Sequence, residues 1–206
     1  MYLTKIQPNM RHPGVRHCMT NCHDMHRTLM SGFSDVPTQS ARADIGLLYR
    51  IIPGTPTTIW LSSKVTPDPQ NLENKGFIVL GTRCFSPLEQ AFFAGQTLRF
   101  ELLAVPSKKT PTTGKNSRRS YLKTQEERTQ WLIRKGEQNG FKLLHLAERQ
   151  EEKIVGSRKN APLIFTATAW EGVLEVTDEA AFWHGLCNGI GAERAYGAGM
   201  LMVRGV

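Results

Sequence analysis

The clearest helical pattern in this chain lies in residues 22–33, where apolar side chains recur every three or four positions. On a wheel of 3.6 residues per turn, one stripe holds Cys22, Met25, Leu29 and Phe33. Asn21 directly precedes this stripe and is a favourable N-cap residue, and Asp24 suits the positive end of the helix dipole. The pattern therefore predicts a short helix that buries this stripe against a core.

On the same wheel, His26 falls at the edge of the buried stripe, and His23 and Arg27 lie one step nearer to solvent. An imidazole held there by packing and open to a ligand suits proton transfer, because it exchanges protons close to neutral pH. Two other interpretations stay open. One is a half-buried packing histidine, and the other is a zinc site with ligands from Cys18, Cys22, His23 and His26, although their spacing is a weak zinc signature.

The rest of the first half reads as strands separated by turns. Alternating or continuously apolar segments predict strands at 1–7, 44–52, 57–64 and 76–80. We expect a basic loop with Pro8, Pro13 and Gly14 between the first strand and the helix, and a short helix after Pro67 and Pro69. The predicted order is βαββαβ.

The pattern in the second half of the chain predicts the same order of elements. Its strands are expected at 98–105, 141–146, 163–176 and 199–203. Thr124, with Glu126 and Glu127 in the first turn, predicts the start of a helix that ends before Gly140. Asp178 is expected to cap a second helix, which runs to Cys187. The polar run 148–160 is expected to form an excursion outside the sheet.

Two βαββαβ halves predict an α+β protein of tandem ferredoxin-like, or RRM-like, domains with antiparallel sheets. The boundary is expected between an N-terminal domain, 1–93, which carries the histidine helix, and a C-terminal domain, 94–206. No residue-level repeat relates the halves, so this duplication is inferred from element order.

Composition narrows the class of protein. The N-terminus lacks the apolar region of a signal peptide, and no run approaches the length of a membrane span. The four cysteines are too few and too scattered for a disulfide framework, which favours reduced thiols. These features predict a cytoplasmic protein.

The chain carries a formal net charge of +8, which favours a polyanionic partner. The surplus is clustered in a basic loop, 107–123, and at a second position where Arg158 and Lys159 follow Gly156 and Ser157. A solvated surface would also explain such clusters, so charge alone does not identify a nucleic-acid site.

A glycine-rich segment, 189–199, is the most unusual local composition. It follows a helix instead of a strand, which excludes the dinucleotide-binding motif. Glycines permit close backbone packing or close approach to an anion, and both interpretations stay open.

Three segments together resemble the CasE family, the precursor CRISPR RNA endoribonucleases of type I-E systems. They are Met-Tyr-Leu-Thr-Lys-Ile at 1–6, Asp-Met-His-Arg-Thr-Leu at 24–29, and Gly-Ile-Gly-Ala followed by Tyr-Gly-Ala-Gly-Met-Leu within 189–201. The resemblance implies tandem ferredoxin-like domains that bind a CRISPR repeat RNA hairpin. It also implies cleavage at the base of the stem without metal or cofactor, and retention of the product with other subunits in Cascade.

By this resemblance, His26 falls on the catalytic histidine. His23 stands where relatives often carry a tyrosine, and it is the candidate for the second proton carrier. Ser31 stands where some relatives carry a lysine, so Arg27 or Lys108 is the candidate for offsetting charge in the transition state.

The expected chemistry is attack of a 2′-hydroxyl on the adjacent phosphate, which leaves a 2′,3′-cyclic phosphate and a 5′-hydroxyl. The expected RNA contacts are Arg27, Lys108, Lys109, Lys115, Arg118, Arg119, Arg158, Lys159 and Arg194. The alternatives are an RNA-hairpin-binding module that does not cut and a zinc-stabilised nucleic-acid adaptor, and neither half shows an obvious aromatic RNP-type strand motif.

Overall fold

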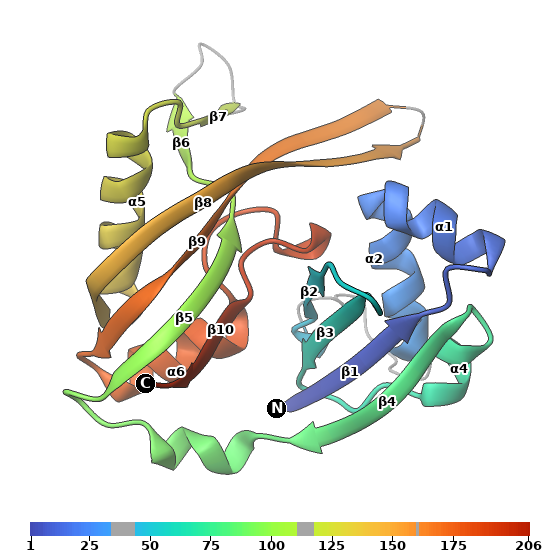
Figure 1. The fold of residues 1–206 in the computed structure, drawn as a ribbon, viewed down its shortest axis with the longest axis horizontal. Coiled ribbons are helices and arrows are strands. Elements are labelled where there is room, and N and C mark those ends of the chain that lie inside the picture. Colours follow the sequence, from blue (N-terminus) through green and yellow to red (C-terminus); the bar gives the residue numbers. More distant parts are fainter. Residues whose placement is uncertain (34–43, 111–117, 160) are drawn as a thin grey trace. The chain divides into compact units, whose positions relative to one another are not determined.

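The computed structural model of the chain describes residues 1–33, 44–110, 118–159 and 161–206 (Figure 1). They form two compact units. The first unit contains Met1–Ala91, Ile154–Phe165 and Arg194–Gly197. The second unit contains Phe92–Lys153, Thr166–Glu193 and Ala198–Val206. Each unit is described by itself below.

The first unit is built on a four-stranded sheet in the order β2-β3-β1-β4. Its strands are β1 (Tyr2–Pro8), β2 (Leu48–Ile52), β3 (Thr58–Ser63) and β4 (Phe77–Cys84). All three pairings are antiparallel, and Ile6 of β1 faces Ile59 of β3. Both isoleucines are fully buried, so the centre of the sheet is anchored in the core.

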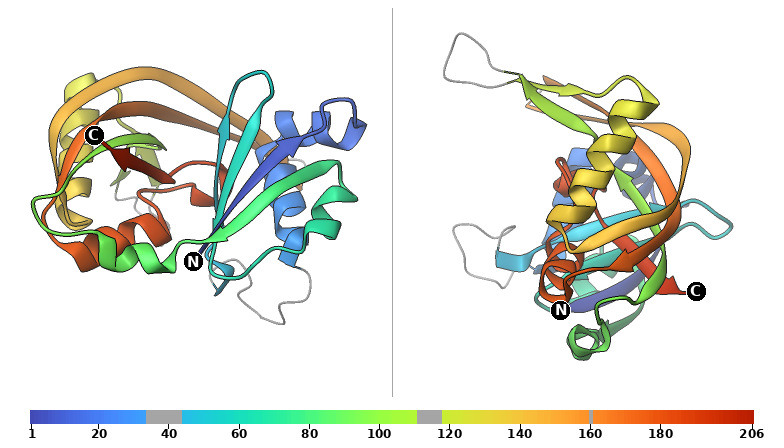
Figure 2. Two further views of the ribbon diagram at one scale, coloured as in Figure 1. Left: turned by 60° about the horizontal axis from the view of Figure 1, so that its bottom comes forward. Right: turned by 90° about the vertical axis from the view of Figure 1, so that its left-hand side faces the viewer.

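Helices cover one face of this sheet, as the left view of Figure 2 shows for α2 and α4. The helical elements are α1 (Pro13–Thr20), α2 (Cys22–Met30), the 3₁₀ turn η1 (Ser31–Phe33) and α4 (Pro69–Glu73), and the turn η2 (Ser86–Ala91) follows β4. The predicted stripe of α2 is buried in this core together with Val15, Leu61 and Phe77. The helix prediction for residues 22–33 is confirmed, with the last three residues in η1.

The second unit has a sheet in the order β10-β5-β9-β8. Its strands are β5 (Thr97–Ala104), β8 (Phe141–Arg158), β9 (Ala161–Val176) and β10 (Leu201–Gly205). A separate hairpin pairs β6 (Ser107–Thr110) with β7 (Arg118–Tyr121). The helices are α5 (Gln125–Gln138) and α6 (Glu179–Asn188), which pack into one core through Trp131, Leu132 and Phe182.

Both sheets place their first and third strands in the centre and their second and fourth strands at the edges. With a helix after the first and third strands, this is the ferredoxin-like arrangement, so the predicted α+β fold with tandem domains and antiparallel sheets is confirmed. Along the chain, the first boundary between the two units falls between Ala91 and Phe92. We propose that 1–93 and 94–206 are the two domains and that 154–165 and 194–197 extend from the second domain to complete the first unit.

Three local predictions were wrong. The expected basic loop after β1 contains α1, which starts with Pro13 at its N-terminus and buries Val15 and Cys18 one turn apart. The apolar pattern of α1 is short and lies among basic residues, so it gave no clear indication of a helix. Asp44 and Ile45 are helical, and β2 begins only at Leu48.

The third wrong prediction is the excursion at 148–160, because β8 continues as a strand through Arg158. The polarity of this segment has a local cause. Glu148 and Glu151 pair with the buried guanidinium of Arg128 on α5, at 2.5 and 3.0 Å. The acids therefore fasten the strand to a helix, and the strand needs no alternating apolar side chains there.

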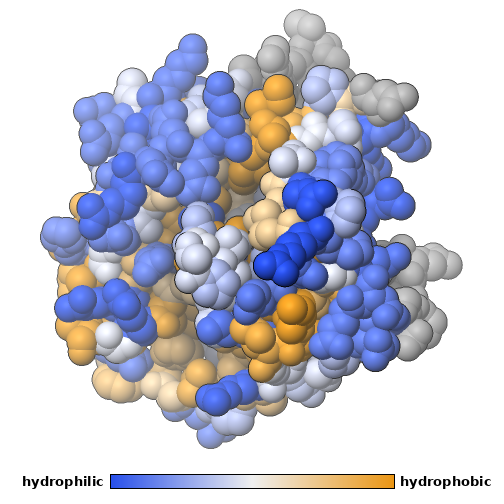
Figure 3. Space-filling view, turned by 45° about the vertical axis from the view of Figure 1, so that its right-hand side comes forward, coloured by the Kyte–Doolittle hydropathy of each residue, from blue (hydrophilic) through white to orange (hydrophobic). Residues whose placement is uncertain are grey.

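Hydrophilic residues predominate on the face shown in Figure 3, with apolar residues visible in patches between them. None of the helices within the described ranges is long and apolar enough to cross a membrane.

Candidate active site

The site is built on the first turn of α2. Asn21 has an extended backbone, and its side-chain oxygen accepts hydrogen bonds from the backbone N–H groups of His23 (3.1 Å) and Asp24 (3.4 Å). This is the N-cap geometry that the sequence predicts. Because the cap and the buried stripe fix the rotation of the helix, His23 and His26 emerge on a defined side of it.

Both histidines are half-buried and lie beside the same aromatic ring. The ring centroid of Tyr196 is 6.1 Å from that of His26, nearly perpendicular to it, and 6.4 Å from that of His23. Phe165 stacks on Tyr196, with its ring centroid 5.5 Å from that of Tyr196 and an angle of 13° between the rings. The two imidazoles therefore share one aromatic neighbour, which holds both near the same point.

Tyr196 reaches this position through the glycine-rich segment. It closes the 3₁₀ turn η3 (Arg194–Tyr196), and Gly197 follows with φ of +85°. A Cβ at residue 197 would lie 2.9 Å from the ring of Tyr49, which is fully buried. At this residue the segment is a close packing contact, which supports the packing interpretation there.

Tyr49 shares a buried core with Met25 and Leu29 of α2. Burial, with smaller effects from Cys22 and Tyr196, raises the pKa of the Tyr49 hydroxyl far above its ordinary value. This phenol therefore stays protonated over the whole range in which imidazoles exchange protons.

His23 carries a further sign of a functional position. Its Nδ1 is buried and, among the described residues, has no hydrogen-bond partner. Buried polar atoms without a partner are uncommon in proteins, and each calls for an explanation such as a ligand or a catalytic role.

A basic hairpin tip lies against the start of α2. Ser157, at the end of β8, contacts Asn21 through its backbone N–H and its hydroxyl. The next two residues, Arg158 and Lys159, are exposed, and Lys159 adopts a positive φ of 48°. The structure therefore brings the predicted contacts Arg158 and Lys159 into the same unit as the histidines.

The other predicted cations fall into three groups. Arg27 is exposed on α2, 3.7 Å from Asp24, and Arg194 is half-buried in η3, both in the first unit. Lys108, Lys109 and Arg119 lie on the β6–β7 hairpin of the second unit, where Lys109 faces Arg119 directly. For Arg118 only the backbone in β7 is described, and Lys115 lies outside the described residues.

The zinc alternative invokes Cys18 and Cys22, which are both buried. The Sγ of Cys18 lies 3.2 Å from the hydroxyl oxygen of Thr28. Over the described part of the chain, no group of three or more histidine, cysteine or acidic side chains is arranged to hold a metal ion.

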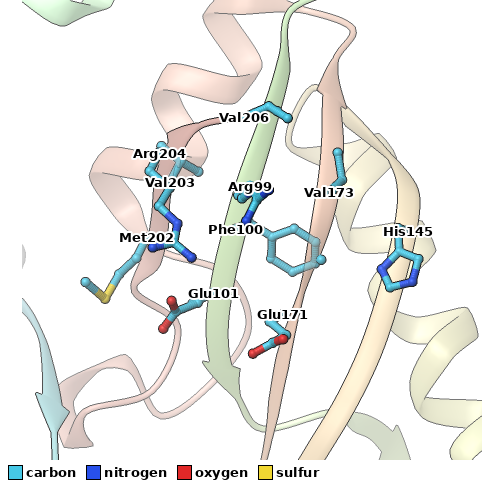
Figure 4. A pocket seen from close by; sticks show the side chains of 11 residues that line it. Arg99, Phe100, Glu101, His145, Glu171, Val173, Met202, Val203, Arg204 and Val206 are labelled. Carbon is cyan, nitrogen blue, oxygen red and sulfur yellow. The ribbon is translucent and has the colours of Figure 1, made fainter.

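A separate hollow of about 450 Å³ lies on the face of the second sheet that the β5 side chains Arg99 and Glu101 share (Figure 4). Arg99 faces Arg204 across β5 and β10, and Glu101 faces Glu171 across β5 and β9. Its two guanidinium groups are thus matched by two carboxylates. The hollow lacks the net positive charge and the paired imidazoles of the α2 site.

The sequence profile of a family described as "CRISPR associated protein" matches residues 1–205. The chain belongs to this family. A curated CRISPR-associated relative, the endoribonuclease Cse3 of Thermus thermophilus, is 32% identical over 219 residues, with 98% of this chain and 99% of the relative covered. The resemblance to the CasE family is thereby confirmed.

Solved structures of CRISPR-associated proteins share the fold. Thermus thermophilus Cse3 bound to an RNA representing a pre-cleavage complex matches with a TM-score of 0.84 and 31% identity, over 98% of each chain. Cas6e from Escherichia coli str. K-12 matches with a TM-score of 0.73 and 20% identity over the full length of both chains. The second likeness concerns the fold alone.

Sequence reasoning missed two members of the site in this CRISPR-associated protein. Tyr196 lies in the glycine-rich segment that the sequence singled out, but nothing in that composition points toward the histidines. Phe165 carries no local signal, because it reads as one more apolar residue of a strand. The functional roles of His26, His23 and the basic residues stay predictions.

Proposed function

We propose that this chain is an endoribonuclease that binds CRISPR repeat hairpins and cleaves precursor crRNA at the base of the stem. The observation that carries the proposal is the pair of imidazoles beside Tyr196, on a helix whose N-terminus contacts a hairpin tip with two exposed cations. Proton carriers and phosphate-binding groups therefore occur within one compact unit. Family membership supports the same substrate class.

The proposed reaction needs two proton transfers. The 2′-oxygen forms a bond to the adjacent phosphorus as its proton passes to one imidazole, and the bond from phosphorus to the 5′-oxygen breaks as that oxygen receives a proton. His26 and His23 divide these two roles. The products are a 2′,3′-cyclic phosphate and a 5′-hydroxyl, and each general acid or base contributes about 10²- to 10⁴-fold to the rate.

Negative charge on the phosphorane calls for a nearby cation. Ser31 offers none, and its hydroxyl donates a 2.7 Å hydrogen bond to the carbonyl of Thr28. Arg27, one residue after His26 and exposed, is the nearer candidate along the chain, and Lys108 is the second. We propose that Arg27 offsets this charge once RNA displaces its 3.7 Å contact with Asp24.

The RNA stem is proposed to be held through its phosphates. Arg158 and Lys159 contact it from the first unit, and Lys108, Lys109 and Arg119 contact it from the β6–β7 hairpin. Like charges directly opposite on paired strands, as at Lys109 and Arg119, repel one another unless an anion lies between them. RNA duplexes have a deep, narrow major groove, so shape and phosphate contacts are expected to dominate recognition.

From the family we further propose that the product stays bound and that the chain acts with the other Cascade subunits in the cytoplasm. Neither metal nor cofactor is required for the proposed reaction.

The decisive experiment is the replacement His26→Ala, assayed with the repeat RNA of the CRISPR array in the source organism. We expect single-turnover cleavage to fall by about 10²- to 10⁴-fold while RNA binding is retained, because the change removes one proton carrier. His145→Ala, at an exposed histidine of the second unit, is the matched control.

Two further arms test the chemistry. RNA with a 2′-deoxy nucleotide at the scissile position should bind and stay intact, and EDTA should leave cleavage unchanged. Undiminished cutting by the His26→Ala variant would discard the assignment. Binding without any cleavage by the unaltered chain would favour the non-catalytic RNA-binding module.

A further inference from the structure

Asn21 makes two sets of contacts at once. Its Oδ1 accepts the N-cap hydrogen bonds of α2 and also accepts one from the backbone N–H of Ser157, at 3.3 Å. Its Nδ2 donates to the hydroxyl oxygen of Ser157 at 3.4 Å. With 9% of its surface exposed, this amide is shielded from competing water. A single side chain therefore joins the start of the histidine helix to the end of β8.

The backbone of the hairpin is closely fitted to the same point. A Cβ at Gly156 would lie 2.7 Å from Oδ1 of Asn21 and 2.8 Å from Sγ of Cys22. Distances below 3.0 Å require something to move, and a substitution at residue 156 would push the tip away from the helix. Glycine at this position permits the direct contact.

Both residues of this contact lie within two positions of a side chain with a proposed function. Ser157 immediately precedes Arg158 and Lys159, the exposed cations proposed to grip the RNA stem. Asn21 is two residues before His23, and its oxygen bonds the backbone of His23 itself. The path from a phosphate-binding side chain to a catalytic imidazole thus passes through one hydrogen-bonded amide.

We infer that Asn21 is a positioning residue that sets the histidine helix in register with the RNA held by the hairpin tip. This inference rests on the proposed function. Asn21 contacts neither reacting atoms nor RNA in this role. Its effect is exerted on the cleavage step, because a misplacement of about 1 Å in a reacting group can lower a rate by about 100-fold.

Substitutions at residues 21 and 156 distinguish the contact with Ser157 from the N-cap role of Asn21. Serine is about as good an N-cap as asparagine, but it has no amide nitrogen to donate to the hydroxyl of Ser157. Asn21→Ser therefore keeps the cap and weakens the link, and Gly156→Ala breaks the link from the hairpin side. Gly54→Ala is the matched control, since a Cβ there meets only the carbonyl of Pro56 at 3.4 Å.

The test measures three quantities on the full-length chain: thermal unfolding, affinity for the 2′-deoxy repeat RNA, and single-turnover cleavage at saturating protein. For Asn21→Ser and Gly156→Ala we expect the cleavage rate to fall by about 10- to 100-fold. The melting temperature and the RNA affinity should change little, and Gly54→Ala should match the unaltered chain.

Two results would overturn the inference. One is cleavage by Asn21→Ser at the original rate, which would reduce Asn21 to a cap. The other is a loss that saturating protein restores, which would place the contact in RNA binding. Failure of the unaltered chain to cleave the same RNA is a distinct outcome, because it removes the proposed function itself and the inference with it.

Discussion

Tyr196 is the residue on which the two histidines converge, and its contribution lies in its ring. The ring lies beside His26 and His23 and stacks on Phe165. Gly197 lets the chain turn directly behind it against Tyr49. The ring of Tyr196 thus restricts the orientation of the two imidazoles, as the proposed proton transfers require.

We predict that Tyr196→Ala lowers the single-turnover cleavage rate by about tenfold, since contacts between aromatic rings are each worth about 0.5–1.5 kcal/mol. Tyr196→Phe keeps the ring and should cleave close to the original rate. Rates for both variants at saturating protein provide the check. If the phenylalanine variant were as slow as the alanine variant, the hydroxyl group and not the ring would be responsible.

At the scale of elements, helix α5 begins with a full capping box. The side chain of Thr124 accepts from the backbone N–H of Glu127, and the carboxylate of Glu127 accepts from the backbone N–H of Thr124. The backbone hydrogen bond at Thr124, followed by the contact with Lys108, lowers the pKa of Glu127. The ionised form of this carboxylate is therefore the one that stabilises the folded chain.

A lowered pKa in the folded state gives stability that is present above the ordinary pKa of glutamate and is lost as pH falls through the lowered value. We therefore predict that Glu127→Gln has a lower melting temperature than the unaltered chain at pH 7 and that the two converge at an acid pH below the lowered pKa. Thermal unfolding at both pH values measures this. Glu126→Gln is the control, and an equal difference at both pH values would contradict the prediction.

Over the whole molecule, the surplus of eight positive charges is concentrated in a few segments instead of being spread evenly. The described basic residues that are proposed to bind RNA occur in both units. They lie at the tip of the β8–β9 hairpin and on the β6–β7 hairpin. Cations that contact phosphates release counterions, so their number sets the salt dependence of RNA binding.

We predict that Arg158→Ala and Lys109→Ala each reduce the slope of log affinity against log salt concentration by about 1. The double variant should lose about 2, because each cation neutralises its own phosphate. Fluorescence anisotropy with the 2′-deoxy repeat RNA over a salt series measures the slopes. Lys142→Ala, at a lysine 2.8 Å from Glu175, should leave the slope unchanged, and an unchanged slope for Arg158→Ala would remove the hairpin tip from the interface.

The local sequence pattern was sufficient to predict most of the helices and strands. The stripe of α2, its cap at Asn21, the capping box of α5 and the βαββαβ order of elements in both halves all follow from periodicity and from the hydrogen bonds that helix ends require. It failed where a polar segment was ordered by a distant partner, as at Glu148, which bonds to the buried Arg128.

The sequence by itself determined the two ferredoxin-like folds, the family and the helix that presents His23 and His26. Only the tertiary structure decided that Tyr196, Phe165 and Ser157 meet that helix. The physical reason is the range of the interactions. Caps and apolar stripes act between residues a few positions apart, whereas these contacts depend on where a long hairpin and a glycine-rich turn end in space.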